Sequence, residues 1–324
     1  MDTAPLLSLP YLSDDLARLE PELVTAVGSG DPFLDEVTTH LISAGGKRLR
    51  PCLALAAATG GRRPASAEDL LGAVAVELVH LASLYHDDVM DDALVRRNVD
   101  SVNARWGNLI AIVAGDFLLA RSAEIAASLG TEIAGLLANT LGQLCQGQVT
   151  EVHGAFSPAR TEDDYLRTIE GKTAALMSTS CRIGALTGGA ARPEVEVLTR
   201  FGRCFGMLFQ LRDDVLDVVA SDEELGKAAG QDLAEGIYTL PVLFALEDPA
   251  TGSELRPLLG QPLDQPERDK ARAIVADSDA ITRTVTTGRR FVDEAVEAAA
   301  AVGDATLGRA LGDVARSLLD DLPA

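Results

Sequence analysis

The sequence predicts an all-α fold, and three observations carry the prediction. Proline, which interrupts helix interiors, is absent between Pro64 and Pro158. Aromatic residues, which favour strands, make up only 4% of the 324 residues. Apolar residues recur at helical spacing in the longest proline-free stretch, as at Leu71, Val74, Leu78, Leu81 and Tyr85. We therefore expect helices throughout and no substantial sheet.

Glycine and proline clusters divide the chain into the expected helices. In chain order these are 14–27, 32–43, 47–59, 67–92, 108–129, 131–153, 161–171, 173–188, 194–220, 238–247, 265–277, 280–300 and 304–320. No break between them resembles a flexible linker, and the long apolar helices would wrap one core. We expect one domain over residues 1–324, with residues 1–13 as an extended N-terminal tail.

Composition and charge narrow the classes of partner. A net charge of −21 argues against nucleic acid or an anionic membrane surface as a partner. No window approaches the roughly 20 apolar residues of a membrane span, and the N-terminus lacks the features of a signal peptide. The four cysteines form no C-x-x-C pair, which favours reduced thiols. A cytoplasmic location is the simplest expectation.

Two acidic motifs of the form D-D-x-x-D each end a long apolar segment. They are Asp87, Asp88 and Asp91, and Asp213, Asp214 and Asp217. On a helix, residues four apart share a face, so the first and last aspartates of each motif repel one another unless a cation lies between them. One such cluster would be read as a solvated helix end, because the chain has 49 acidic residues. Two such clusters indicate cation binding, and oxygen-only ligands favour Mg²⁺, whose remaining positions are filled by water and substrate phosphates.

Cations accompany both acidic motifs. Gly45–Pro51 reads G-G-K-R-L-R-P and places Lys47 and Arg50 on one face at an expected helix start, which suits a phosphate group. The segment lacks the Walker A pattern, so no nucleotide triphosphatase is indicated. Arg96 and Arg97 follow the first motif, and Lys172 and Lys227 each follow a glycine. Each alone would be read as a surface cation, but together they indicate a diphosphate held by metal ions between acidic walls.

From about residue 40 to 245 the sequence resembles the trans-isoprenyl (polyprenyl) diphosphate synthases. The resemblance rests on G-G-K-R-L-R-P (45–51), H-D-D-V-M-D (86–91), N-A-R-W-G-N (103–108), A-G-D-F-L-L-A (114–120), G-K-T (171–173), F-Q-L-R-D-D-V-L-D (209–217) and G-K-x-x-G-x-D-L-x-E-G (226–236). It implies an isoprenoid-synthase-type antiparallel helical bundle around a central cavity, usually as a homodimer. It also implies head-to-tail condensation of an allylic diphosphate, such as farnesyl or geranylgeranyl diphosphate, with isopentenyl diphosphate and release of diphosphate. The implied cofactor is Mg²⁺, about three ions per active site, with Mn²⁺ as a substitute.

The resemblance also implies roles for individual residues. Asp87 and Asp91 would bind two Mg²⁺ and Asp213 a third, with Asp88, Asp214 and Asp217 in support. The implied contacts to isopentenyl diphosphate are Gly46, Lys47, Arg50, His80 and Arg97. Those to the allylic diphosphate are Arg96, Lys172, Thr173, Gln210 and Lys227. His86 is expected to be structural.

The chain departs from the family pattern at two positions. Many members continue the last motif as E-G-K, whereas Ile237 follows Gly236 here. A cation for the allylic diphosphate is missing, which leaves open a weaker affinity or another arginine in its place. Asn98 stands where R-R-G is common, and it tolerates a left-handed backbone nearly as well as glycine does.

Small side chains precede Asp87 and bear on product length. Ala82 and Ser83 occupy positions where a bulky aromatic closes the cavity in short-product members, and Val79 lies one turn further along. We expect a product longer than C20, in the range C30–C50 of quinone side chains, which would be handed to a membrane. A C15–C20 farnesyl or geranylgeranyl diphosphate synthase is the alternative. A class I terpene cyclase would lack the second D-D-x-x-D motif and G-G-K-R-x-R-P, and a non-catalytic partner subunit tends to lose the acidic motifs.

Overall fold

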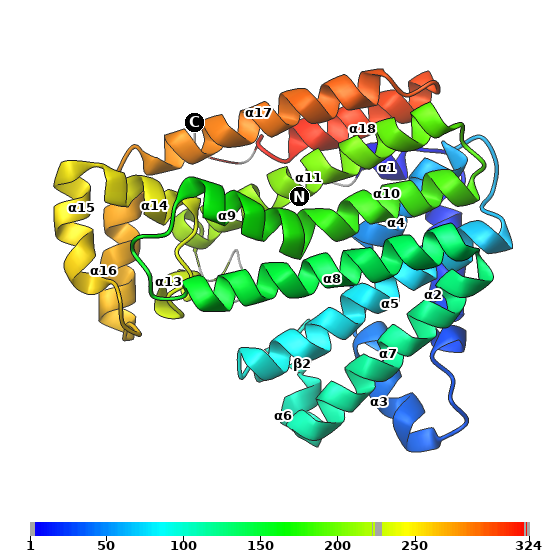
Figure 1. The fold of residues 1–324 in the computed structure, drawn as a ribbon, viewed down its shortest axis with the longest axis horizontal. Helices are drawn as coiled ribbons and strands as arrows, with labels where there is room; N and C mark the ends of the chain where they lie inside the picture. Colours follow the sequence, from blue (N-terminus) through cyan, green and yellow to red (C-terminus); the bar gives the residue numbers. More distant parts are fainter. Residues whose placement is uncertain (1–3, 222, 224–228, 321, 323–324) are drawn as a thin grey trace.

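The computed structural model describes residues 4–221, 223, 229–320 and 322, and these form a layered bundle of long helices (Figure 1). Its first half contains α1 (Ala4–Leu7), α2 (Leu12–Ala26), α3 (Pro32–Ser43), α4 (Leu49–Thr59), α5 (Ala67–Met90), α6 (Val102–Trp106), α7 (Asn108–Ser128) and α8 (Thr131–Gly154). Its second half contains α9 (Glu162–Ile169), the π-helical turn η1 (Glu170–Ala174), α10 (Ala175–Thr187), α11 (Arg192–Val219), α13 (Gln231–Ala234), α14 (Leu240–Glu247), α15 (Pro249–Leu255), the 3₁₀ turn η2 (Arg256–Leu258), α16 (Gln265–Ala276), α17 (Ala280–Ala300) and α18 (Ala305–Ser317). The expected all-α fold is confirmed. Within the described ranges the one sheet is a hairpin of β1 (Val95–Arg96) and β2 (Val99–Asp100).

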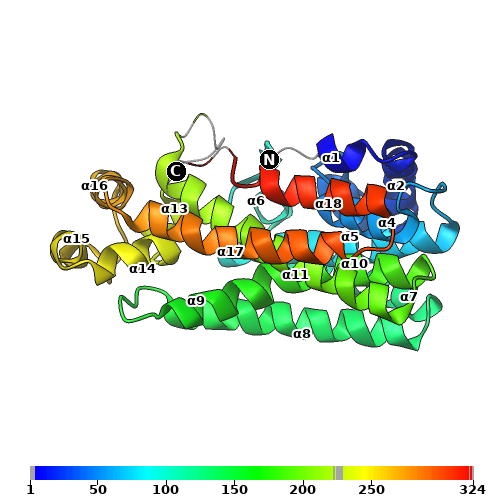
Figure 2. The same ribbon diagram turned by 90° about the horizontal axis from the view of Figure 1, so that it is seen from above.

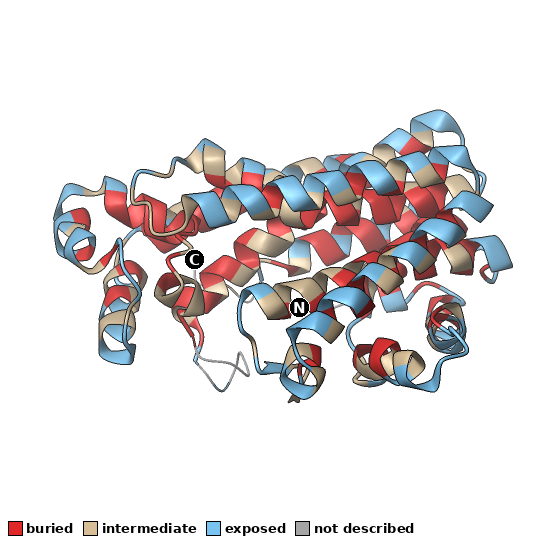
Figure 3. Cartoon of the chain, turned by 60° about the horizontal axis from the view of Figure 1, so that its bottom comes forward, coloured by how far each residue is buried: buried red, intermediate tan, exposed pale blue. Residues whose placement is uncertain are grey.

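The long helices lie in layers that enclose the core. Figure 2 shows α17 and α18 on one side, α8 on the other, and α10 and α11 between them. Helix α5 packs against α4, α7 and α10, and α11 packs against α10 and α17. Buried residues follow the inner faces of these helices while exposed residues follow the outer ones (Figure 3). This pattern is expected where apolar burial drives the packing of amphipathic helices.

One helix crossing is so close that it requires glycine. A Cβ atom placed on Gly184 of α10 would lie 1.9 Å from the carbonyl oxygen of Ala54 in α4. The two backbones therefore approach each other directly at this point. Helix α4 carries Arg50, so the crossing also fixes one wall of the candidate site described below.

The structure corrects the expected N-terminal tail. Residues 4–11 form α1 and a turn rather than an extended segment, and Leu6 and Leu9 are buried. Helix α1 packs against α18, because its leucines supply an apolar face that an extended solvated segment could not bury. Helices α6, α13 and α15 and the hairpin were not expected from the sequence, since each is short.

The break expected at Gly171–Thr173 is also different in the structure. Helix α9 passes through η1 into α10 without a break.

Among the described residues, no helix combines the length and apolarity needed to cross a bilayer.

Candidate active site

The first acidic motif lies at the C-terminal end of α5. Asp87 is half-buried in the last turn, and Asp91 is the exposed residue that caps the helix. Burial raises the pKa of Asp87, and burial together with the charge of Asp87 raises the pKa of Asp91 to about 6. Carboxylates at a helix C-terminus also oppose the helix dipole. This motif is therefore poised to gain from a bound cation.

The second acidic motif lies near the C-terminal end of α11. Asp214 is buried, where it accepts hydrogen bonds from the Tyr165 hydroxyl and, at 2.8 Å, from Gln210 Nε2. Burial raises the pKa of Asp214 to about 7. Asp213 is half-buried with Arg212 Nη1 3.7 Å from its carboxylate, and Asp217 is buried and accepts a hydrogen bond of 3.4 Å from Asp232 N at Oδ2.

The fold brings the two motifs to one hollow. A cavity of about 140 Å³ is bordered by Asp91 from the first motif and Asp214 from the second, together with Lys172, Thr173 and Gln210. Arg50 lies close enough to both motifs that Asp87 and Asp213 each affect its pKa. One residue of each acidic motif, Asp91 and Asp214, therefore borders the same cavity.

The π-helical turn places Lys172 and Thr173 at this hollow. Lys172 Nζ forms an ion pair with Glu151 of α8, and Thr173 Oγ1 donates a hydrogen bond of 2.8 Å to Gln210 Oε1. Burial alone would lower the pKa of Lys172, but Glu151, Asp87 and Asp91 raise it. Glu151 was missed from the sequence, because it is one acid among many and belongs to no motif.

Arg50 and Arg96 form a cationic wall beside Asp87. Burial lowers the pKa of Arg50, and its Nε has no hydrogen-bond partner among the described residues. Burial and the charge of Arg50 hold the pKa of His80 well below its usual value, so this imidazole is neutral. Asp88 is buried, and its Oδ1 accepts a hydrogen bond of 2.7 Å from Arg96 Nε, which compensates in part for its burial.

The remaining expected isopentenyl diphosphate contacts differ in their surroundings. Arg97 Nη1 donates to the carbonyl oxygens of Leu41, at 2.9 Å, and of Gly45. Gly46 lies against the same guanidinium, since a Cβ placed on it would be 2.9 Å from Arg97 Cζ. Lys47 is exposed in the turn before α4. Lys227 lies outside the described residues.

An apolar pocket of about 540 Å³ opens beside the cationic wall, between α5, α7 and α8. Arg50, His80, Asp87 and Lys172 border its polar end. Along α5 it is lined by Val79 and Ser83, two of the three residues that the sequence analysis expects to limit product length. Ala82, expected to act with them, is fully buried in the core and does not line the pocket, because it lies on another face of α5. His86 also borders the pocket, with Nε2 3.2 Å from the carbonyl oxygen of Ile112.

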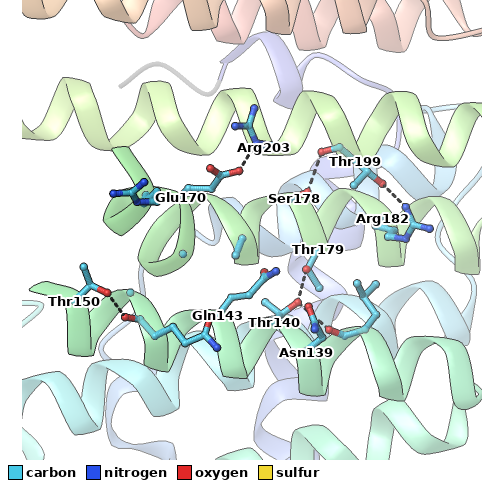
Figure 4. Close-up of a pocket in the computed structure, with 16 residues that line it drawn as sticks. Asn139, Thr140, Gln143, Thr150, Glu170, Ser178, Thr179, Arg182, Thr199 and Arg203 are labelled. Carbon is cyan, nitrogen blue, oxygen red and sulfur yellow. Dashed lines mark hydrogen bonds and ion pairs between the residues drawn. The ribbon is translucent and has the colours of Figure 1, made fainter. Parts of the chain in front are cut away.

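A separate polar hollow of about 730 Å³ lies between α8, η1, α10 and α11 (Figure 4). None of the expected site residues that the structure describes lines it. Its arginines are already paired with carboxylates, as Arg182 with Glu196 at 2.8 Å and Arg203 with Glu170 at 2.5 Å. The hollow with the acidic motifs is therefore the better candidate for an anion held through cations.

Comparison with known proteins agrees with this geometry. The sequence profile of the family described as Polyprenyl synthetase matches residues 31–277. The chain belongs to this family. Among relatives, it is 42% identical over 290 residues to heptaprenyl diphosphate synthase component 2 of Geobacillus stearothermophilus, covering 88% of this chain and 89% of that one. It is also 42% identical over 221 residues to geranylgeranyl diphosphate synthase of Methanosarcina mazei, covering 66% of this chain and 68% of that one.

A solved member of the family has the same fold. The crystal structure of polyprenyl synthase from Caulobacter crescentus CB15, complexed with calcium and isoprenyl diphosphate, aligns with this chain with a TM-score of 0.91 and 29% sequence identity. The alignment covers 99% of this chain and 98% of that one. Calcium in that complex is consistent with the use of a divalent metal by the family.

The acidic residues of this chain suit Mg²⁺, which needs few protein ligands, better than a metal ion whose ligands all come from the protein. No group of three or more His, Cys, Asp or Glu side chains in the described ranges is arranged to hold a metal ion. Mg²⁺ binds through one or two carboxylates and completes its shell with water and substrate phosphates. Carboxylates from two different helices, Asp87 and Asp91 at the end of α5 and Asp213 on α11, suit such an ion.

Proposed function

We propose that the chain is a Mg²⁺-dependent trans-prenyltransferase that joins an allylic diphosphate head to tail with isopentenyl diphosphate and releases diphosphate. The observation that supports this most strongly is the hollow that both D-D-x-x-D motifs border, next to an apolar pocket. The hollow would hold a diphosphate, and the pocket would hold a growing hydrocarbon chain.

Each wall has a part in the proposed reaction. Mg²⁺, held by Asp87, Asp91 and Asp213, would stabilise the charge on the diphosphate as the allylic C–O bond breaks. Lys172 and Thr173 would orient that diphosphate, and Gln210 would hold both Thr173 and Asp214 in place. Arg50, neutral His80 and Arg97 would bind isopentenyl diphosphate so that its alkene faces the allylic cation. The released diphosphate would accept the proton that is lost.

Turnover by the purified chain tests this function. With Mg²⁺, isopentenyl diphosphate and farnesyl diphosphate, we expect diphosphate release and a longer prenyl product. A cyclic hydrocarbon formed without use of isopentenyl diphosphate would identify a terpene cyclase. No diphosphate release by the chain alone would favour a partner subunit.

The pocket favours a product longer than C20, and graded substitutions test this. Ser83 lies one helical turn from Asp87 and Val79 lies two turns away, and one turn rises about 5.4 Å, close to one isoprene unit. We expect Ser83→Phe to shorten the main product to about C20 or less, and Val79→Phe to stop it about one five-carbon unit later. Chromatography of the dephosphorylated products measures both. Equal product lengths for the two variants would show that the chain does not grow along α5.

We further propose that the chain is a homodimer. Exposed apolar side chains on α7 and α8 would form the contact, among them Leu109 at 74% and Val149 at 62% exposure. The name of the Geobacillus relative includes "component 2", which makes a second, different chain the alternative. Light scattering separates a dimer from a monomer, and activity restored only by a second protein would establish the two-component arrangement.

The raised carboxylate pKa values predict how stability depends on pH. The pKa of Asp214 is about 7 in the folded chain, against an ordinary value of 3.8 for this carboxyl group. Between these values the folded chain binds more protons than the unfolded chain, so this carboxyl group's contribution to stability falls as pH rises. We expect metal-free protein to lose roughly 3 kcal/mol of stability through Asp214 between about pH 5 and pH 8, and Mg²⁺ with pyrophosphate to raise Tm more at about pH 8 than at about pH 5.

Calorimetry of Asp214→Asn provides the matched control. The variant removes this titration without removing the side chain, so its stability relative to the parent protein should increase with pH. A difference that does not change with pH would contradict the prediction.

A further inference from the structure

The hollow between the acidic motifs contains a cation that the mechanism above does not use. Arg160 lies in the loop between α8 and α9 and lines this hollow beside Lys172, Asp91 and Asp214. The sequence analysis assigned it no role, because no motif surrounds it.

One end of the Arg160 guanidinium lacks a partner. Nη1 donates to the carbonyl oxygen of Tyr238 at 3.3 Å, and Cζ lies 5.6 Å from the ring centroid of Tyr165. Nη2 is buried and has no hydrogen-bond partner among the described residues. A buried, charged donor without an acceptor is costly, so this nitrogen indicates an acceptor that the chain itself does not supply.

Five acidic side chains line the hollow, and two of them, Glu151 and Asp214, are bonded to groups other than Arg160. Glu151 pairs with Lys172, and Asp214 accepts from Tyr165 and Gln210. Burial lowers the pKa of Arg160, and the charges of Glu151 and Asp214 only partly offset this effect. Within the described residues, the Arg160 guanidinium donates to a carbonyl oxygen and to none of these carboxylates, which leaves Nη2 available for an anion.

Backbone contacts hold Arg160 beside Ile237. Phe156 N donates a hydrogen bond of 2.8 Å to the carbonyl oxygen of Gly236. Gly236 has φ of +74°, and a Cβ placed on it would lie 2.3 Å from Phe156 Cδ1. The loop before α9 is thereby packed against the segment that carries Ile237, which lines the same hollow. Ile237 is the position at which the sequence departs from E-G-K.

We propose that Arg160 binds a phosphate oxygen of the allylic diphosphate through Nη2, next to Lys172, and so supplies the cation that position 237 lacks. The proposal rests on the proposed function for the identity of the substrate. A guanidinium suits the role, because its planar donors match phosphate oxygens and it stays charged when partly buried.

Substitution of Arg160 tests the proposal through two readouts. For Arg160→Leu we expect KM for the allylic diphosphate to rise about 10- to 100-fold, while KM for isopentenyl diphosphate is unchanged. Calorimetric titration with inorganic pyrophosphate and Mg²⁺ should show a similar loss of affinity without any turnover. Arg160→Lys should fall between the parent protein and Arg160→Leu.

A second substitution separates charge from loop structure. Ile237→Lys in the Arg160→Leu background returns a cation to the hollow without restoring the contacts with Tyr238 or Tyr165, and it should recover most of the pyrophosphate affinity. Arg167→Leu is the matched control, because Arg167 lies on the neighbouring α9, pairs with Asp164 at 2.5 Å and is 69% exposed. It should bind pyrophosphate as the parent protein does.

The outcomes distinguish this proposal from the proposed function. Unchanged pyrophosphate affinity in a folded Arg160→Leu or Arg160→Lys variant would overturn the role of Arg160, as would equal losses for both substrates. Should Arg160→Leu fail to fold, Arg160→Lys and Arg160→Gln provide the same comparison. A parent protein that binds pyrophosphate but never elongates an allylic diphosphate would overturn the proposed function and leave the anion site measurable.

Discussion

Replacing Asp87 with asparagine is expected to lower kcat/KM about 10³-fold. The change removes one charged ligand from the wall that would hold Mg²⁺, and the charge on the leaving diphosphate would then lose several kcal/mol of stabilisation. The fold should survive, because burial raises the pKa of Asp87 and the unliganded structure therefore gains nothing from its charge. Steady-state kinetics at several Mg²⁺ concentrations measures the loss, together with calorimetric titration by Mg²⁺ and pyrophosphate.

Asp92→Asn is the matched control for this prediction. Asp92 follows Asp91 directly, but it is exposed and has φ of +49°, a left-handed conformation that asparagine tolerates. Its replacement should leave kcat/KM unchanged. Comparable losses in Asp87→Asn and Asp92→Asn would show that net negative charge near α5, rather than a defined ligand, supports activity.

Replacing Gly184 with alanine is expected to destabilise the fold by about 3 kcal/mol or more. The added methyl group would lie 1.9 Å from the Ala54 carbonyl oxygen, and neither backbone can yield without separating α4 from α10. Urea unfolding measures the loss. Because α4 carries Arg50, affinity for isopentenyl diphosphate should fall as well.

Gly135→Ala provides the comparison on another helix. No atom lies within 4 Å of a Cβ placed on Gly135, which is exposed in α8. Alanine should stabilise that helix by roughly 0.5–1 kcal/mol. Equal effects of the two substitutions would contradict the close crossing of α4 and α10.

The sequence predicted the long helices well, because proline and glycine mark their ends and apolar spacing marks their buried faces. It predicted the short elements poorly. Helix α15 lies between the expected helices 238–247 and 265–277, and its Pro249 occupies the first helical turn, where proline is tolerated. Helix α1 was taken for a tail, because its burial depends on α18 at the other end of the chain.

Within the site, the predictable residues were those in motifs. The facing of Asp87 and Asp91 follows from helical spacing alone, and the resemblance supplied Lys172 and Gln210. Glu151 and Arg160 could not be found in this way, because each acquires its position from contacts between distant segments. Ala82 was misplaced for a related reason: sequence spacing does not show which face of a wholly buried helix meets the pocket.

The π-helical turn between α9 and α10 has a consequence for how the chain can vary. A turn closed by bonds from residue i to i+5 accommodates one residue more than a regular α-helical turn. Deleting a single residue from Glu170–Ala174 could therefore yield an unbroken regular rod, and it would rotate Lys172 and Thr173 relative to α10 by about 100°. Such a variant would retain the helical bundle but lose the proposed contacts of Lys172 and Thr173 with the leaving diphosphate. A change of length in this turn would therefore be limited by the loss of activity and not by the loss of the fold.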